Sequence, residues 1–142
     1  MDLIVSTEWL AAELGKPDLI VLDVTKYLPN EPLDGKAEFA KARIPGARFL
    51  DIDEAADQET TLPHMVPTAG RFAKVMGALG VSNAHRVVLY DQKGLHSSPR
   101  GWWLLRLFGH EKAAVLDGGL PKWKAEGRAL ESGAPGPVAP AE

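Results

Sequence analysis

The stretch that decides the fold consists of Arg86–Tyr90 (RVVLY), Asp91–Arg100 (DQKGLHSSPR) and Gly101–Leu107 (GWWLLRL). Its first part is a short apolar run rich in β-branched residues, which is typical of a strand buried on both faces. Its last part is apolar at helical spacing, and Pro99 suits the first turn of a helix. Backbone N–H groups converge at such a strand-to-helix junction and can hold an anion.

Strands and helices alternate on both sides of this stretch. The patterns predict strands over residues 18–23, 47–50, 86–90 and 113–116 and helices over 7–14, 36–42, 68–79, 98–108 and 119–123. This alternation predicts an α/β domain with a mainly parallel central sheet, flanked by helices on both faces. Ligands of such sheets bind beyond the carboxyl ends of the strands, so the candidate site lies in the loops after Asp23, Leu50, Tyr90 and Leu116.

Length and charge narrow the class of protein. We expect residues 1–131 to form one domain and residues 132–142, rich in Gly, Pro and Ala, to resemble a linker. Sixteen Lys and Arg against nineteen Asp and Glu give a net charge of -3, which predicts no general attraction to nucleic acid or to an anionic membrane. No apolar run is long enough to span a bilayer and the start lacks the basic region of a signal peptide, so we expect a cytoplasmic protein.

The chain contains no cysteine, which excludes disulfides, thiolate metal sites and a cysteine nucleophile within it. Its four histidines are His64, His85, His96 and His110, and they lack the spacing of metal ligands. We therefore expect neither a metal nor another cofactor.

His110 follows the glycine that stops a helix, so we expect it to cap or pack there, whereas His85 is expected to be solvated.

A series of short motifs, in order along the chain, resembles the rhodanese domain. The resemblance is closest to the amino-terminal domain of two-domain thiosulfate and 3-mercaptopyruvate sulfurtransferases, and it covers about Val5 to Trp123. The motifs are STEWL at 6–10, LD at 22–23, IPGARF at 44–49, DID at 51–53, LPHM at 62–65, LYD at 89–91, SSPRGWW at 97–103, FGH at 108–110 and VLDGG at 115–119. The family commonly has Gly-His before the Ile-Pro-Gly-Ala turn. Arg43 stands there instead, and we expect it to keep an exposed polar role.

The resemblance implies where the reacting sulfur would be carried. In the catalytic domain of that family a cysteine opens the loop after this strand and takes up sulfane sulfur as a persulfide, stabilised by backbone amides and a helix N-terminus. The matching position here is Asp91, and a carboxylate cannot carry a persulfide. The resemblance therefore implies the non-catalytic domain of the pair, with a second, Cys-containing rhodanese domain expected downstream as partner.

The resemblance also implies assisting groups on this domain. The family pattern has an aspartate and a histidine that are proposed to move protons around the cysteine, and they match Asp53 and His64. An aspartate can fix the tautomer of an imidazole, which titrates near neutrality. The structural alternative is that Asp53 is a cap and His64 is a surface or loop-packing residue. His96, Ser97 and Arg100 are further candidates for the cleft or its loop, and Arg100 could instead pair with Asp91 or with Asp23, an expected scaffold acid.

Three functions remain from the sequence. The first is the amino-terminal domain of an enzyme that moves sulfur from thiosulfate or 3-mercaptopyruvate to cyanide or a thiol, with this chain alone inactive. The second is a stand-alone, non-catalytic binding or regulatory module with the rhodanese fold. The third, a serine hydrolase using Ser97 or Ser98, lacks a nucleophile-elbow motif, and these serines are typical helix caps.

Overall fold

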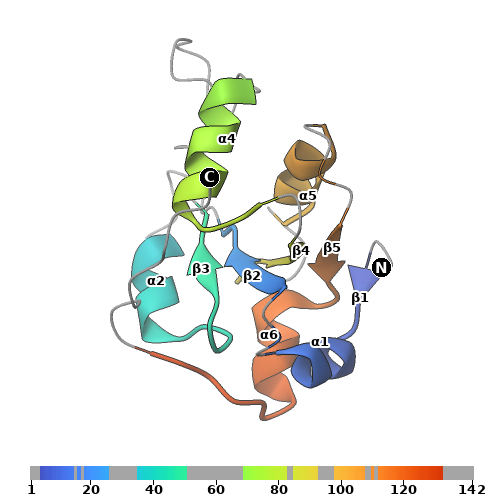
Figure 1. The fold of residues 1–142 in the computed structure, drawn as a ribbon. Coiled ribbons are helices and arrows are strands. Elements are labelled where there is room, and N and C mark those ends of the chain that lie inside the picture. The colour runs from blue at the N-terminus through green and yellow to red at the C-terminus, as the bar shows by residue number, and fades with distance from the viewer. Residues whose placement is uncertain are drawn as a thin grey trace.

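Strands and helices alternate along the chain in the computed structural model, which describes residues 4–14, 16, 18–25, 35–50, 69–82, 85–92, 98–107, 110 and 112–132 (Figure 1). The strands are β1 (Ile4–Val5), β2 (Leu19–Asp23), β3 (Arg48–Phe49), β4 (Arg86–Tyr90) and β5 (Ala113–Leu116). The helices are α1 (Thr7–Glu13), α2 (Gly35–Lys41), α4 (Ala69–Ala78), α5 (Ser98–Leu107) and α6 (Gly119–Ala125).

The strands form one five-stranded sheet in the order β1-β5-β4-β2-β3. Every neighbouring pair is parallel, which confirms the predicted α/β class with a parallel sheet. β2 and β4 are paired along their whole length, so that Asp23 lies opposite Tyr90 at their carboxyl ends. Because all five strands run in one direction, the segments that follow β2 and β4 leave the sheet side by side.

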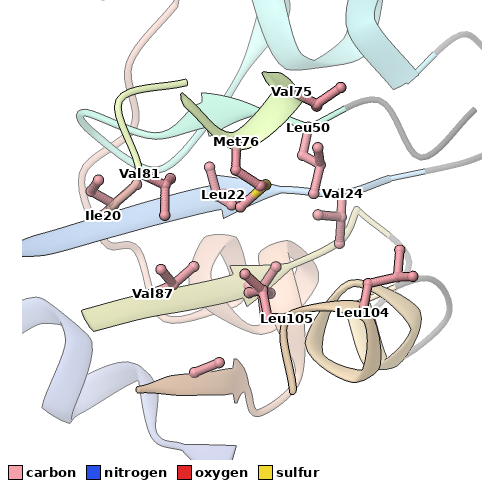
Figure 2. Packing of buried hydrophobic residues seen from close by; sticks show 12 residues of the cluster. Ile20, Leu22, Val24, Leu50, Val75, Met76, Val81, Val87, Leu104 and Leu105 are labelled. Carbon is pink, nitrogen blue, oxygen red and sulfur yellow. The ribbon is translucent and has the colours of Figure 1, made fainter. Parts of the chain in front are cut away.

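Both faces of the sheet are covered, which explains why the central strands are continuously apolar. Ile20 and Leu22 of β2 belong to one buried cluster, with residues of α4 and α5 (Figure 2). Val21 points the other way, into a second cluster formed with residues of α1, α2 and α6. The predicted arrangement of helices on both faces is therefore confirmed. None of the helices in the described ranges combines the length and the apolar content that crossing a membrane requires.

Local signals placed several helix ends correctly. Ser6 caps α1, and its hydroxyl accepts a hydrogen bond from the backbone N–H of Trp9 at 3.0 Å. Gly118, with a φ of 77°, is the N-cap of α6, and Gly119, with a φ of 57°, is its first residue, so this pair forms the tight turn into the helix. A side chain at Gly118 would also meet Lys122, because an added Cβ would lie 2.6 Å from that side chain.

The structure adds one strand that the sequence did not predict. β1 has two residues and pairs with β5 at the edge of the sheet, with Ile4 opposite Val115. A two-residue strand is too short to show an alternating pattern, and Ile4 remains 57% exposed. The strand therefore exists because β5 offers it a partner, which no local sequence pattern records.

The expectation of an exposed Arg43 is wrong. Its side chain is 2% exposed, and its Nε donates to Oε1 of Glu131 at 2.9 Å. The two residues also exchange both backbone N–H to carbonyl bonds, at 3.0 and 2.8 Å, and the guanidinium carbon lies 4.9 Å from the centre of the Phe39 ring. Arg43 is buried because the segment after α6 crosses over it and supplies a carboxylate. This contact ties residue 131 to the turn after α2.

Candidate functional site

A buried polar cluster occupies the carboxyl ends of β2 and β4. Asp23 closes β2 with no exposed surface, and its Oδ1 accepts hydrogen bonds from the backbone N–H and the hydroxyl of Thr25. Its Oδ2 accepts from the side-chain amide of Gln92 at 2.9 Å. The backbone N–H of Gln92 in turn donates to the Thr25 hydroxyl at 2.8 Å. Asp23 thus joins the two segments that leave the sheet, which fits the expected scaffold role.

Asp91 follows β4 directly and has no exposed surface. Its Oδ2 accepts a hydrogen bond from the backbone N–H of Ser98, seven residues further on, at 2.9 Å. Its carbonyl oxygen accepts from the N–H of Leu120 in α6 at 3.1 Å. The Asp91 side chain therefore caps the start of α5, and its backbone holds α6 in place.

Of the two serines that the sequence offers as caps of α5, Ser98 is not the cap, and Ser97 lies outside the described residues. Ser98 is the first residue of that helix, and its backbone N–H is bound by Asp91. Its hydroxyl oxygen is buried and has no hydrogen-bond partner. The cap comes from outside the helix because the chain returns to the end of β4, where a carboxylate is already in place.

Arg100 lies in the first turn of α5, two residues after Ser98. Its guanidinium carbon is 5.1 Å from the centre of the Trp103 ring, a cation–π contact along one face of the helix. The Trp103 side chain is itself 41% exposed. The Asp23 carboxylate, which the sequence offered as a partner for Arg100, is bound by Thr25 and Gln92.

A cavity of about 380 Å³ opens beside this cluster, between α2 and α6. Gln92 lies in its wall, so the amide that binds Asp23 also borders the cavity. The other described lining residues are Glu38, Lys41, Ala42, Leu120, Pro121 and Lys124. Lys41 forms an ion pair with Glu38 at 2.8 Å. Lys124 adds a second positive charge, so the charged residues of the lining have a net positive charge.

Four residues predicted for the site, Asp53, His64, His96 and Ser97, lie outside the described residues. Asp23 and Asp91 lie together at the carboxyl ends of β2 and β4. Arg100 lies in α5, the helix whose start is bound by Asp91. The described parts of the chain contain no cluster of His, Asp and Glu able to hold a metal ion.

The two described histidines have structural roles. The backbone N–H of His110 bonds to the carbonyl of Leu105 at 2.8 Å and closes α5, as expected for a cap. Its Nε2 lies 2.9 Å from the carbonyl oxygen of His85, and burial lowers the pKa of His110. His85 is only half-buried, but it is not simply solvated, because its Nδ1 lies 3.0 Å from the backbone nitrogen of Ser82.

Sequence reasoning missed Thr25 and Gln92. An aspartate two residues before a threonine, directly after a strand, is a known local signal for side chain-to-backbone bonding, and Asp23 and Thr25 have that spacing. No local signal marks Gln92, because its role depends on β2 lying next to β4.

Replacing Asp23 with Asn should flatten part of the pH dependence of stability. Burial raises the pKa of Asp23 above its usual 3.8, so the folded state binds this proton more tightly than the unfolded state. The resulting stabilisation is present below the unfolded pKa and is lost as pH rises through the folded pKa. Urea titrations from about pH 4 to 8 should show the wild type losing stability relative to Asp23→Asn as pH rises. A difference between the two that does not change with pH would contradict this assignment.

Comparison with known proteins gives the site a family context. Residues 6–126 match the family described as Rhodanese-like domain. The chain is 50% identical over 133 residues to the mitochondrial thiosulfate/3-mercaptopyruvate sulfurtransferase 1 of Arabidopsis thaliana, covering 94% of this chain and 35% of that protein. It is 44% identical over 145 residues to the 3-mercaptopyruvate sulfurtransferase of Homo sapiens, covering 98% of this chain and 48% of that protein.

A solved structure shows the same fold. SseA from Escherichia coli, described as a 3-mercaptopyruvate sulfotransferase with the rhodanese fold, superimposes with a TM-score of 0.92 at 36% identity. The superposition covers 100% of this chain and 54% of that one. The chain thus spans about half the length, or less, of the relatives it matches. Since the family match extends over residues 6–126 and includes β2, β4 and the segments that carry Asp23 and Asp91, the chain belongs to the rhodanese-like domain family.

Proposed function

We propose that this chain is the amino-terminal domain of a two-domain sulfurtransferase. The whole protein would move sulfane sulfur from thiosulfate or 3-mercaptopyruvate to a thiophilic acceptor, cyanide or a thiol. The proposal rests on how the chain aligns with its relatives. Two relatives with sulfurtransferase names align with 94% and 98% of this chain, but the chain spans only 35% and 48% of their length. The chain would provide one wall of an active site that lies between two domains.

The chemistry explains why a second domain is needed. Sulfur transfer through a persulfide requires a thiolate that attacks the sulfane sulfur, and this chain has no cysteine. The residue at the expected cysteine position, Asp91, has a buried carboxylate bonded to the start of α5. We therefore assign the nucleophile to a Cys-containing rhodanese domain beyond this chain.

For the chain's own part in catalysis, we assign Asp53 and His64 to the wall that faces the cysteine. A neutral imidazole there could take a proton from the thiol or from an acceptor thiol, and an aspartate could orient its ring. Both residues match positions in the family pattern and lie outside the described residues. They would be positioning or proton-transferring groups and not nucleophiles.

The competing function is a stand-alone, non-catalytic module with the same fold. The coding sequence beyond Glu142 separates the two. A following rhodanese domain with a cysteine in the loop after its central strand is the result expected for the enzyme, whereas a stop codon directly after Glu142 would favour the module.

Location is part of the same proposal. We assign the whole protein to the cytoplasm, although one relative is described as mitochondrial. A fluorescent fusion to the carboxyl end of the full-length protein tests this, and accumulation in an organelle would overturn it.

His64→Ala in the proposed two-domain protein should lower kcat for mercaptopyruvate about 10²- to 10⁴-fold, since a general acid–base group contributes on that order. The same variant should unfold within about 0.5 kcal/mol of the wild type, because the proposal assigns His64 to the wall of a cleft and not to the core. His85→Ala is the matched control and should leave kcat unchanged. If His64→Ala and the wild type had equal kcat, His64 would have no part in proton transfer and its role would be structural.

A further inference from the structure

The cavity between α2 and α6 has the place and the size of a small-molecule site. Its volume of about 380 Å³ lies within the range of such sites. Its wall contains Gln92, at the end of β4, and Leu120, whose backbone N–H donates to the carbonyl of Asp91 at 3.1 Å. It therefore lies beside the carboxyl ends of the strands, where parallel sheets bind their ligands. No described residue of α5 lines it.

The two walls of the cavity are held together by the segment that follows α6, which runs from that helix across to the side of α2 (Figure 1). At α6, the indole Nε1 of Trp123 donates to the carbonyl of Ala129 at 2.8 Å. At α2, the buried guanidinium of Arg43 binds the Glu131 carboxylate at 2.9 Å. Because this segment is fixed at both helices, the cavity is preformed, which lowers the cost of binding a ligand there.

The charges of the two walls differ. On the α2 wall, Lys41 is neutralised by Glu38, at 2.8 Å. On the α6 wall, Lys124 forms no ion pair within the part of the chain that the structure describes. Lys122, two residues earlier in the same helix, has a carboxylate oxygen of Asp117 at 3.6 Å. The cavity therefore presents a single uncompensated cation, which suits a ligand with one negative charge.

We propose that this cavity binds a small organic carboxylate. Lys124 binds the carboxylate, and Leu120 and Pro121 contact a compact apolar body, because they supply apolar surface in the same wall. This division between one charged contact and apolar surface is usual in small-molecule sites. The inference stands apart from the proposed function, because it concerns residues of this chain alone and needs no second domain.

Titration of the 142-residue chain with sodium benzoate, at constant ionic strength, tests the site. Benzoate is the probe because it joins one carboxylate to a compact apolar ring. The backbone amide resonances of Gln92, Leu120 and Lys124 should shift together and saturate with one Kd. Benzyl alcohol, which has the ring without the charge, should bind about fivefold more weakly, the upper end for one exposed ion pair. Shifts that do not saturate, or equal affinities for the two compounds, would overturn the proposal.

Variants on the two walls locate the charge. Lys124→Gln should raise the Kd for benzoate about fivefold, whereas Lys122→Gln, the matched control outside the cavity lining, should leave it unchanged. Glu38→Gln should lower the Kd about twofold, because Lys41 then loses its carboxylate partner. An equal loss of affinity in both lysine variants would mean that only the overall charge matters. That result, or weaker binding by Glu38→Gln, overturns the proposal.

Discussion

Purified as the 142-residue chain, the protein is expected to produce no thiocyanate from thiosulfate and cyanide, and no pyruvate from 3-mercaptopyruvate. The reason is chemical: no residue of the chain can form a persulfide. Loss of the nucleophile from an enzyme costs on the order of 10⁶-fold in kcat, which would place any residual rate within the uncatalysed background. The colour of the ferric thiocyanate complex measures the first reaction directly.

The full-length protein is the positive control for this assay and should turn over both donors or one of them. The same protein with the proposed cysteine of its second domain changed to serine should be as inactive as the 142-residue chain. Clear turnover by the cysteine-free chain would contradict the assignment of Asp91 to the nucleophile position. It would also remove the main reason for placing the active site between two domains.

The central sheet could be predicted because its information is local. β2 and β4 are buried on both faces, so their sequences are unbroken apolar runs that end in an acid or a tyrosine. The helix ends at Ser6 and at Gly118 also follow from single residues with strong conformational preferences. β1 escaped prediction because only its pairing with β5 makes it a strand.

Two expectations from the sequence, one on the fold and one on the site, failed because of contacts between residues far apart in the chain. Arg43 is an ordinary surface residue by its local sequence, and it is buried only because Glu131 lies 88 residues away in the chain but beside it in space. Ser98, one of the two serines expected to cap α5, is instead the first helical residue, and its backbone N–H is bound by the Asp91 carboxylate. In both cases a carboxylate from a distant part of the chain determines the environment of the residue. The type of the residue alone does not reveal that partner.

Asp91 is a residue for which the sequence and the structure give different information. The sequence resemblance implies that its position is that of a missing thiol, which stays a prediction. The structure adds what the carboxylate does there, namely that it binds the start of α5 in a buried environment. The carboxylate that stands at the proposed thiol position thus holds the start of a helix.

Asp23→Ala should lower the free energy of unfolding by about 3 kcal/mol, the largest stability loss expected from a polar change near the site. The substitution leaves three donors without their acceptor: the N–H and the hydroxyl of Thr25 and the amide of Gln92. All of them lie at the carboxyl ends of β2 and β4, so the loss should also loosen the segments that follow these strands. Urea unfolding at neutral pH measures the free energy.

Two variants separate the polar network of Asp23 from a general effect of removing a carboxylate. Asp117→Ala, whose exposed side chain has only a 3.6 Å contact with Lys122, should change stability by less than about 0.5 kcal/mol. Asp23→Asn should retain most of the stability, since its oxygen can still accept from Thr25 and Gln92 can turn its own oxygen toward the new amide. If Asp23→Ala lost no more than Asp117→Ala, the three donors would be satisfied without Asp23, and the carboxylate could not be what joins β2 to β4 at the site.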